Sequence, residues 1–181
     1  MTLKISLKWL IVSLFLILEG ILVVIFNYHN DHDRETIAFT ATVLGGAFAL
    51  YSYLEGIEEK RIQHAYHLIE RWNNVEMLNV RLALLDVVEG RIDATKLIRN
   101  DAAVLERRSH MITALNFFEE LSIAALKKSA NEDRLQEFFS SIVQQSYAKL
   151  DEWIKKERSI DNEPHYYVQF ECLALKWKAH Q

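Results

Sequence analysis

The sequence has a single cysteine, Cys172, a single proline, Pro164, and only five glycines. One cysteine cannot form a disulfide within the chain, which is consistent with a reducing compartment. The sequence also lacks a glycine-rich phosphate loop, a GxSxG motif and a CxxC pair, so the common signatures of nucleotide hydrolysis, serine catalysis and thiol redox chemistry are missing. We therefore expect a protein that is not an enzyme and that holds no cofactor.

The sequence also has no large excess of positive or negative charge. The 21 basic and 25 acidic residues give a formal net charge of −4. Bulk nucleic-acid binding requires a basic surface, because neutralisation of phosphates supplies most of its affinity. We expect no bulk nucleic-acid partner, although a small basic pocket is compatible with this composition.

Two long apolar stretches, Trp9 to Phe26 and Ile37 to Leu54, dominate the first third of the sequence. A bilayer core about 30 Å thick needs roughly 20 apolar residues in a helix, and each stretch is close to that length. Aromatic residues of the kind found at membrane interfaces stand near their ends: Trp9, Tyr28, Tyr51 and Tyr53. Residues 1–54 are therefore predicted to form a transmembrane helical hairpin in a lipid bilayer.

A secretory signal peptide is the alternative for the first stretch, because Lys4 and Lys8 precede it. No small-x-small cleavage site follows Phe26, and the second apolar stretch begins soon afterwards. We therefore expect the hairpin to remain in the mature protein.

The basic residues that flank the apolar stretches predict the orientation. Lys4 and Lys8 precede the first stretch, Lys60 and Arg61 follow the second, and the connecting loop has only Arg34. Basic flanks tend to stay on the cytoplasmic side, so both termini are predicted to be cytoplasmic.

Glu19 is an ionisable residue among apolar neighbours in the first stretch. Such a group is costly in lipid and usually indicates an internal partner, a pore or protonation. The second stretch has small residues at three- and four-residue spacing, which permit close helix approach: Ala38, Thr42, Gly45 or Gly46, and Ala49. We expect a homo-oligomer that forms through the membrane, with Glu19, Gly45 and Gly46 as its functional residues there.

Residues 55–181 have helical spacing of apolar side chains throughout, and no run alternates as a half-buried strand does. Helices are predicted to end near Asn73, to begin after Asn74, Asp93 and Asn131, and to stop at Gly90. Two more are predicted at about residues 101–128 and after Pro164. The predicted fold is all-α: a two-helix transmembrane hairpin at residues 1–54, followed by one cytosolic bundle of about five helices at residues 55–181.

Spacing also predicts which side chains these helices bury. In the helix after Asn74 the buried stripe is predicted to be Leu78, Leu82, Leu85 and Val88. In the last helix it is predicted to be Tyr166, Tyr167, Phe170, Leu173 and Trp177, and Cys172 lies in this presumed core helix.

The segment Arg71-Trp72-Asn73 is the best candidate for ligand contact, with the basic residues Lys60 and Arg61 nearby. Arginine offers a planar fork for phosphate, tryptophan a stacking face for a base, and asparagine an amide for an adenine edge. The alternative is structural, because a tryptophan at a helix end commonly packs in a core and asparagines commonly cap helices.

Two further groups of polar residues are candidate sites. Asn116 and Glu120 are four residues apart in an apolar helix, which favours a polar network inside the bundle over a pocket wall, and Asn116 is kept as a candidate ligand contact. His64, His67 and Glu70 resemble a metal site, but two histidines without a third ligand are incomplete, so no metal is expected.

From about Ala65 to Trp177 the chain resembles a widespread bacterial family of unknown function, whose members join hydrophobic N-terminal spans to a helical domain. The blocks that carry the resemblance are Arg71-Trp72-Asn73, residues 115–121 (LNFFEEL), Phe138-Phe139, and the closing residues Tyr166-Tyr167, Phe170-Glu171, Leu173-Ala174 and Trp177. In layout the chain is also similar to the two-span membrane effectors of type III CRISPR antiviral systems, which bind cyclic oligoadenylate. These resemblances imply a bacterial inner membrane.

Two function classes follow. The first is an antiviral defence effector, whose cytosolic domain binds a cyclic oligonucleotide and whose oligomeric spans perturb the inner membrane. Its predicted ligand contacts are Lys60, Arg61, Arg71, Trp72, Asn73 and Asn116. The second is a membrane-anchored interaction or scaffold module without ligand gating.

Overall fold

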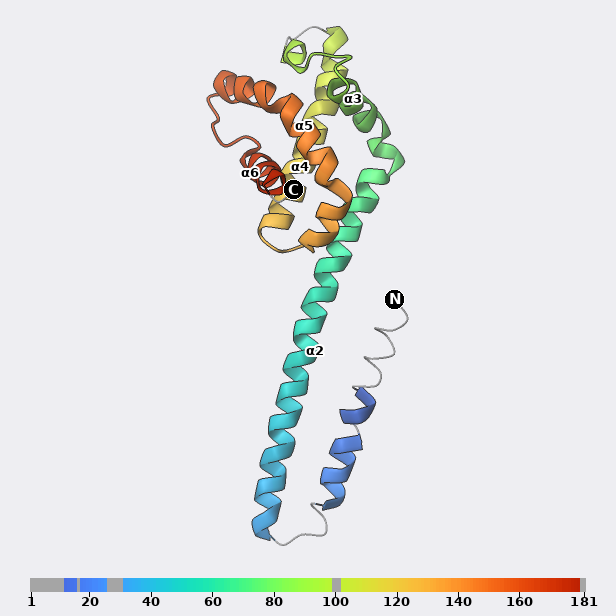
Figure 1. Cartoon of the computed structure of the whole chain (residues 1–181), viewed down its shortest axis with the longest axis vertical. Helices are drawn as coiled ribbons and strands as arrows, with labels where there is room; N and C mark the ends of the chain where they lie inside the picture. Colours follow the sequence, from blue (N-terminus) through green and yellow to red (C-terminus); the bar gives the residue numbers. More distant parts are fainter. Residues whose placement is uncertain (1–11, 16, 26–30, 99–101, 180–181) are drawn as a thin grey trace. The chain divides into compact units, whose positions relative to one another are not determined.

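A computed structural model describes residues 12–15, 17–25, 31–98 and 102–179, and these residues form helices and short connections with no strand among them (Figure 1). The all-α prediction is confirmed for this part of the chain. Its contacts divide the chain into two compact units, Met1–Gly56 and Ile57–Gln181.

The first unit contains the helical segment Val12–Ile25 and the first part of α2 (Asp31–Asn73). Phe15 stacks on Phe48 with ring centroids 4.3 Å apart, so the two helical segments are in contact here. The helix Glu35–Asn73 is long and apolar enough to cross a membrane. None of the residues in its apolar window is buried.

The predicted two-span hairpin is reproduced only in part. The described portion of the first apolar stretch, Val12–Ile25, is shorter than a span, and its ends lie outside the described residues, as do Lys4, Lys8, Trp9 and Tyr28. A helix of 14 residues is about 21 Å long at 1.5 Å per residue, against a hydrocarbon core of about 30 Å. The second span therefore stays a prediction.

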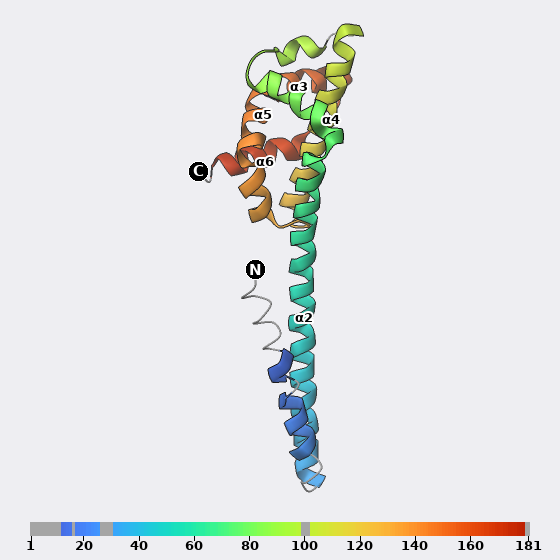
Figure 2. The same ribbon diagram turned by 90° about the vertical axis from the view of Figure 1, so that its right-hand side faces the viewer.

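The second unit contains the rest of α2 and a bundle whose elements are, in order, η1 (Val75–Met77), α3 (Leu78–Val88), η2 (Ala94–Ile98), α4 (Ala102–Leu126), α5 (Glu132–Asp161) and α6 (Val168–Lys178). The short helix α6 packs against both α4 and α5, and α3 packs mainly on α4 (Figure 2). The fully buried core includes Trp153, Trp177 and three phenylalanines, of which Phe118 stacks on Phe170 at 5.0 Å.

Most of the predicted helix ends are confirmed. The Asn131 side chain accepts a hydrogen bond from the backbone N–H of Arg134 at 3.1 Å, and Asp93 accepts one from the backbone N–H of Thr95 at 2.9 Å. Gly90 has φ +76°, a conformation that glycine adopts without steric cost after a helix end. Asn74 does precede a helical turn, η1, but its side chain makes no capping bond.

The predicted stripe of α3 is wrong except at Val88, which is partly buried against the core. Val80, Leu84 and Val87 form its buried face, whereas Leu78, Leu82 and Leu85 are 42%, 52% and 43% exposed. Both sets recur at three- and four-residue spacing, so periodicity alone cannot choose between them. The helix is apolar on two opposite faces, and only one of them is covered within the described residues.

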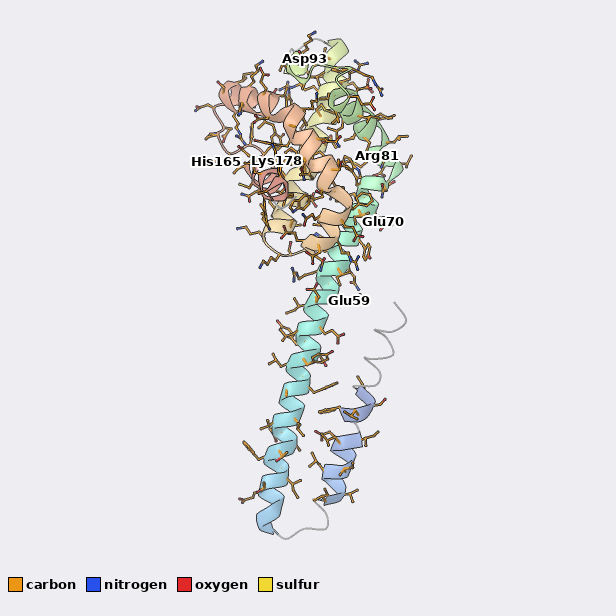
Figure 3. The ribbon with its side chains drawn as sticks, in the orientation of Figure 1. Glu59, Glu70, Arg81, Asp93, His165 and Lys178 are labelled. Carbon is orange, nitrogen blue, oxygen red and sulfur yellow. The ribbon has the colours of Figure 1, made fainter. Side chains whose placement is uncertain are left out.

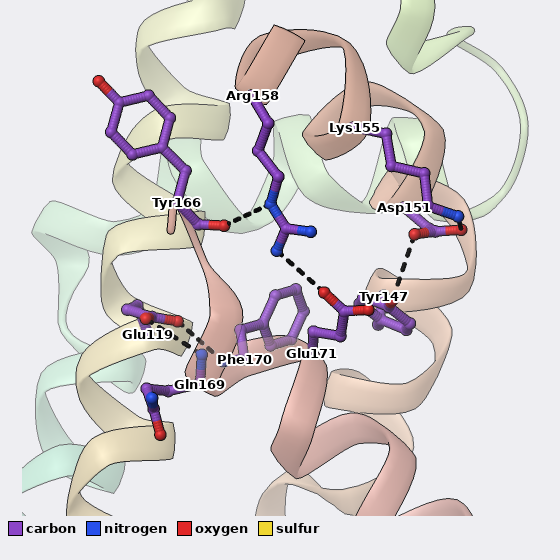
Figure 4. A network of polar contacts seen from close by, with 9 residues as sticks. All are labelled: Glu119, Tyr147, Asp151, Lys155, Arg158, Tyr166, Gln169, Phe170 and Glu171. Atoms are coloured by element: carbon purple, nitrogen blue, oxygen red, sulfur yellow. Dashed lines mark hydrogen bonds and ion pairs between the residues drawn. The ribbon is translucent and has the colours of Figure 1, made fainter. Parts of the chain in front are cut away.

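The start of the last helix also differs from the prediction. Tyr166 and Tyr167 precede α6, and Tyr167 has φ +57°, which interrupts the helical conformation. The side chain of Glu119 in α4 accepts hydrogen bonds from the backbone N–H groups of Gln169 and Phe170, at 3.2 and 2.8 Å (Figure 4). Cys172 lies on α6, which buries Phe170, Leu173 and Trp177 in the core, but its own side chain is exposed.

Candidate functional site

Trp72, predicted to stack on a nucleotide base, is a core residue. It is 4% exposed, and its ring lies 4.9 Å from Phe117 and 5.3 Å from Phe118, centroid to centroid. An aromatic ring packed on this scale gains several kcal/mol from burial, about 3–5 kcal/mol by the usual cost of truncating one. Because α2 turns this side chain toward α4 and α5, its packing favours the structural interpretation of Trp72 over the stacking role.

Arg71 uses its planar fork within the chain. Its two terminal nitrogens donate to the carboxylate oxygens of Glu120 at 2.9 and 2.7 Å, and its guanidinium lies 4.9 Å from the centroid of the Phe117 ring. This pair is largely exposed, so it contributes about 0–1 kcal/mol to stability. Glu120, for which a polar network with Asn116 is predicted, therefore pairs with Arg71 of α2.

The other predicted basic contacts serve helix ends. Arg61 pairs with Glu58 at 2.7 Å, and its backbone carbonyl accepts the N–H of Asn131 at 2.9 Å. Glu58 in turn accepts from the Asn131 side chain at 2.6 Å, which ties α2 to the start of α5. Lys60 is exposed.

Arg81 performs a similar task at the end of α2 (Figure 3). It donates to the backbone carbonyl of Trp72, in the last turn of α2, and to that of Asn74, which also accepts the backbone N–H of Met77 at 3.1 Å. Asn73 is exposed beside them. Among the predicted ligand contacts, Arg71, Trp72 and Asn73 are therefore close in sequence but do not converge on one site.

The histidines do not form a metal site. His64 Nδ1 lies 3.1 Å from the carbonyl oxygen of Ser129, and His67 is exposed. Among the described residues no group of three or more metal-ligating side chains comes together.

In the first unit, Glu19 is half-exposed, and a Cβ added to Gly45 or Gly46 would meet no described atom within 4 Å. These glycines leave room for a neighbouring helix. Their role in an oligomer, and that of Glu19, stays a prediction.

A cavity of about 450 Å³ opens between α4, α5 and the α5–α6 connection. Arg108, Asn116 and Glu119 line it from one face of α4, and Trp153, Glu157 and Asp161 line it from one face of α5. His165 to Tyr167 close it along the connection, on which His165 is labelled in Figure 3. Of the predicted ligand contacts only Asn116 lies here. It lines the cavity wall, which is the less favoured of the two interpretations given for it above.

The lining of this cavity carries more negative than positive charge. Arg108 donates to Glu157 at 3.0 Å, and the Glu157 side chain is only 7% exposed, so these two opposite charges form a mostly buried pair. Glu119 and Asp161 add two further carboxylates. Burial and then the charge of Glu157 raise the pKa of Tyr167 to about 12, so its phenol is a hydrogen-bond donor at neutral pH.

The side chain of Arg158 holds the connection in place. Arg158 of α5 donates through Nε to the carbonyl of Tyr166 at 2.8 Å and through a terminal nitrogen to Glu171 at 2.9 Å (Figure 4). Two residues near its ends, Asn162 and Tyr167, have left-handed backbone conformations that non-glycine residues seldom adopt. The cavity wall is therefore built from a short, well-anchored segment.

Sequence spacing contained a partial signal for this cavity. Arg108, Ile112 and Asn116 recur at four-residue spacing on α4, as do Trp153, Glu157 and Asp161 on α5. Each set lies on one face of its helix, but nothing in the sequence brings the two faces together, because about 45 residues separate them.

The fold and the site define the chain as an all-α domain that follows an apolar N-terminal helix. Residues 39–177 match the family described as a domain of unknown function (DUF4760), and the chain belongs to this family. The search of curated proteins and that of solved structures gave no match. The resemblance to a family of unknown function is thus confirmed, and no comparison supports the narrower likeness to CRISPR effectors.

Proposed function

We propose that the protein is a membrane-anchored interaction module that self-associates through the exposed face of α3. The observation that carries this proposal is the leucine face, formed by Val75 of η1 and by Leu78, Leu82 and Leu85 of α3. These residues are exposed in solvent, while the opposite face of α3 is in the core. Contiguous exposed apolar side chains commonly mark a protein contact. The apolar window of α2 supplies the membrane anchor.

A second copy of the chain is the partner that fits this face. The four residues follow the a, d, a, d positions of a heptad, the spacing with which one helix packs along another. Two copies related by a twofold axis present the same patch to each other, so one apolar stripe on each chain is enough to form a dimer interface. Opposite charges flank it, with Arg81 on one side and Asp86 on the other. Anchoring both copies in one membrane raises their effective concentration.

The oligomeric state of the full chain in detergent tests the proposal. Leu82→Glu places a charge in the middle of the leucine face and is expected to convert a dimer into a monomer, as measured by light scattering after size exclusion. Leu105→Glu is the matched control, because Leu105 is 60% exposed on α4 and lies outside the face. An unchanged oligomer in Leu82→Glu, or a monomeric parent, would contradict the proposal.

An inner-membrane defence effector gated by a cyclic oligonucleotide is the competing proposal. It is favoured by the exposed cations and amide along the second half of α2, namely Lys60, the partly exposed Arg71 and Asn73. Calorimetric titration of the full chain with cyclic tetra- and hexaadenylate tests it. Saturable binding that is weakened by the Arg71→Ala substitution would favour the defence effector. If neither compound binds, the effector is contradicted and the interaction module is the function that is left.

A further inference from the structure

A second cavity, of about 260 Å³, lies between α3 and α5. Its walls are mostly apolar and are formed by Leu84, Leu85 and Val88 of α3, Ile142 of α5 and Trp72 of α2. Leu85 and Gln145, which also line it, are exposed, so the cavity is reached from solvent. An apolar cavity of about 150 Å³ accepts a benzene ring, and this larger one has room for a ring with a short chain.

Arg81 is the one charged residue among those described that line this cavity. Its Nη1 donates to the carbonyl of Trp72 and, at 3.3 Å, to that of Asn74, which holds the guanidinium in place (Figure 3). No carboxylate in the described part of the chain pairs with it, and Asp86 on the same helix pairs with Arg91 instead, at 2.7 Å. Arg81 is therefore a positioned cation without a counter-charge.

Two donors of Arg81 are available to a ligand. Nε and Nη2 have no hydrogen-bond partner among the residues that the structure describes. Neither of these atoms is buried, so both remain accessible from solvent. They lie on one edge of the planar guanidinium, the geometry that donates two parallel hydrogen bonds to the oxygens of a carboxylate.

The walls and the cation together specify the ligand. Apolar walls favour a hydrocarbon body, because its transfer out of water is favourable, and a single placed charge orients it. An anion is attracted to Arg81, and no carboxylate lines the described walls to repel it. A polyanion such as a nucleotide is less well matched, because no second cation lines the cavity in the described part of the chain.

We propose that the cavity between α3 and α5 binds a small monocarboxylate whose apolar body is about the size of a phenyl ring with a short chain. The body lies against Leu84, Val88 and Ile142, and the carboxylate accepts hydrogen bonds from Nε and Nη2 of Arg81. The site goes beyond the proposed self-association. Leu85 belongs to both the cavity and the leucine face, so the variants below leave the leucine face unchanged.

Calorimetric titration of the full chain in detergent, with detergent alone as the blank, tests the ligand class. The probe is 3-phenylpropionate. One control is 3-phenylpropanamide, which keeps the body without the charge, and the other is acetate, which keeps the carboxylate without the body. We expect saturable binding of the probe with a Kd below about 1 mM and binding of each control that is weaker by about tenfold or more. Equal binding of the acid and its amide would overturn the proposal, and so would the absence of saturable binding of the acid in that range.

Arg81→Gln tests the guanidinium, because it removes the charge and keeps an amide donor for the backbone carbonyls. The preference for the acid over the amide is expected to fall from about tenfold or more to near equality. A purely structural role of Arg81 would weaken both compounds equally and leave the preference intact, and that result would contradict the proposal. Arg91→Gln is the matched control, since Arg91 lies outside the cavity, and it is expected to keep the preference.

Ile142→Phe tests the cavity without a change at Arg81. Ile142 lines the cavity from α5 and is partly buried, so a larger side chain there fills space that the ligand requires. Binding of 3-phenylpropionate is expected to weaken by about tenfold or more. Ile160→Phe makes the same change at an exposed position of α5 and is expected to have no effect. Binding in Ile142→Phe as strong as in the parent would refute the site. If one of the two cavity variants does not fold, as judged by circular dichroism, the other decides alone.

Discussion

Glu132 joins the start of α5 to the end of α6. Its carboxylate accepts hydrogen bonds from Lys176 Nζ at 2.6 and 2.8 Å and from Trp177 Nε1 at 3.1 Å. Burial by itself would raise the pKa of Glu132, but the hydrogen bonds from Lys176 and Trp177 outweigh it and hold the pKa below the ordinary value of 4.5. The ionised form is therefore favoured by folding.

This pKa predicts how stability depends on pH. Because the pKa is lower in the folded state, the contribution of Glu132 is fully present above the ordinary value and is lost as the pH falls through the folded-state value. Glu132→Gln is expected to reduce stability by about 1.5–3 kcal/mol at pH 7, the usual contribution of hydrogen bonds to a charged group. The difference from the parent should shrink toward pH 3, as measured by thermal unfolding across that range.

Glu152→Gln is the control for this prediction. Glu152 forms an exposed ion pair with Lys156 at 3.3 Å on the same helix, which contributes about 0–1 kcal/mol. A Glu132→Gln protein with the same difference from the parent at pH 3 as at pH 7 would show that ionisation is not the cause.

Single residues also mark where prediction from sequence stops. Arg71-Trp72-Asn73 has the chemistry of a nucleotide contact and equally that of a helix end against a core, and only the positions of Phe117 and Glu120 decide between them. Asn116 is likewise predicted as a ligand contact from its residue type, and it does line a cavity. Residue type is thus informative about chemistry, while packing decides whether a side chain is free to use it.

At the scale of elements, α6 depends on a contact from outside its own sequence. Its N-cap residue Tyr167 makes no side-chain capping bond, and Glu119 accepts the N–H groups of Gln169 and Phe170 instead. A carboxylate at a helix N-terminus also interacts favourably with the helix dipole. With only 11 residues, α6 is too short to be stable alone.

Glu119→Ala is accordingly expected to loosen α6. Loss of this cap should lower stability by about 1–2 kcal/mol and speed hydrogen exchange over residues 168–178, because two backbone donors lose their acceptor. Hydrogen exchange followed by mass spectrometry measures this directly. Glu120→Ala is the control, since the adjacent carboxylate binds Arg71 at an exposed position. Exchange in α6 that is unchanged by Glu119→Ala would show that α6 is held by packing alone.

The contrast between α5 and α6 explains which helix ends a sequence can predict. Asn131 and Gly90 act on backbone groups that are close to them in the sequence, so the helix ends that they set are predicted correctly from the sequence. The start of α6 is set by a residue about 50 positions earlier, and it was predicted too early. The buried face of α3 fails for a related reason, because it depends on which neighbour covers the helix.

At the scale of the whole molecule, helical periodicity was enough for the fold class, and the apolar run was enough to indicate a helix of membrane-spanning length. The cavity was beyond reach, because its walls come from two helices and a connection whose mutual packing no spacing encodes. Membership of a family of unknown function adds no activity to this account. What the chain does must be determined from its surfaces.

Topology is the property of the whole chain that the sequence predicts most specifically. If the first apolar stretch spans the membrane as α2 is proposed to do, both termini lie on the same, cytoplasmic side. If only α2 crosses, the termini lie on opposite sides. The described helix Val12–Ile25 is too short to decide, since about 20 residues are needed.

Cys172 makes this test direct, because it is the single cysteine of the chain and is exposed. We expect a membrane-impermeant maleimide to label Cys172 in inside-out membrane vesicles and not in intact spheroplasts. In a Cys172→Ser background, a Thr2→Cys substitution is expected to label from the same side, because an even number of spans returns the chain to the side where it began. Labelling of the two positions from opposite sides would establish a single span and would refute the hairpin. Labelling of both from the periplasmic side would keep the two spans and reverse the orientation that Lys60 and Arg61 predict.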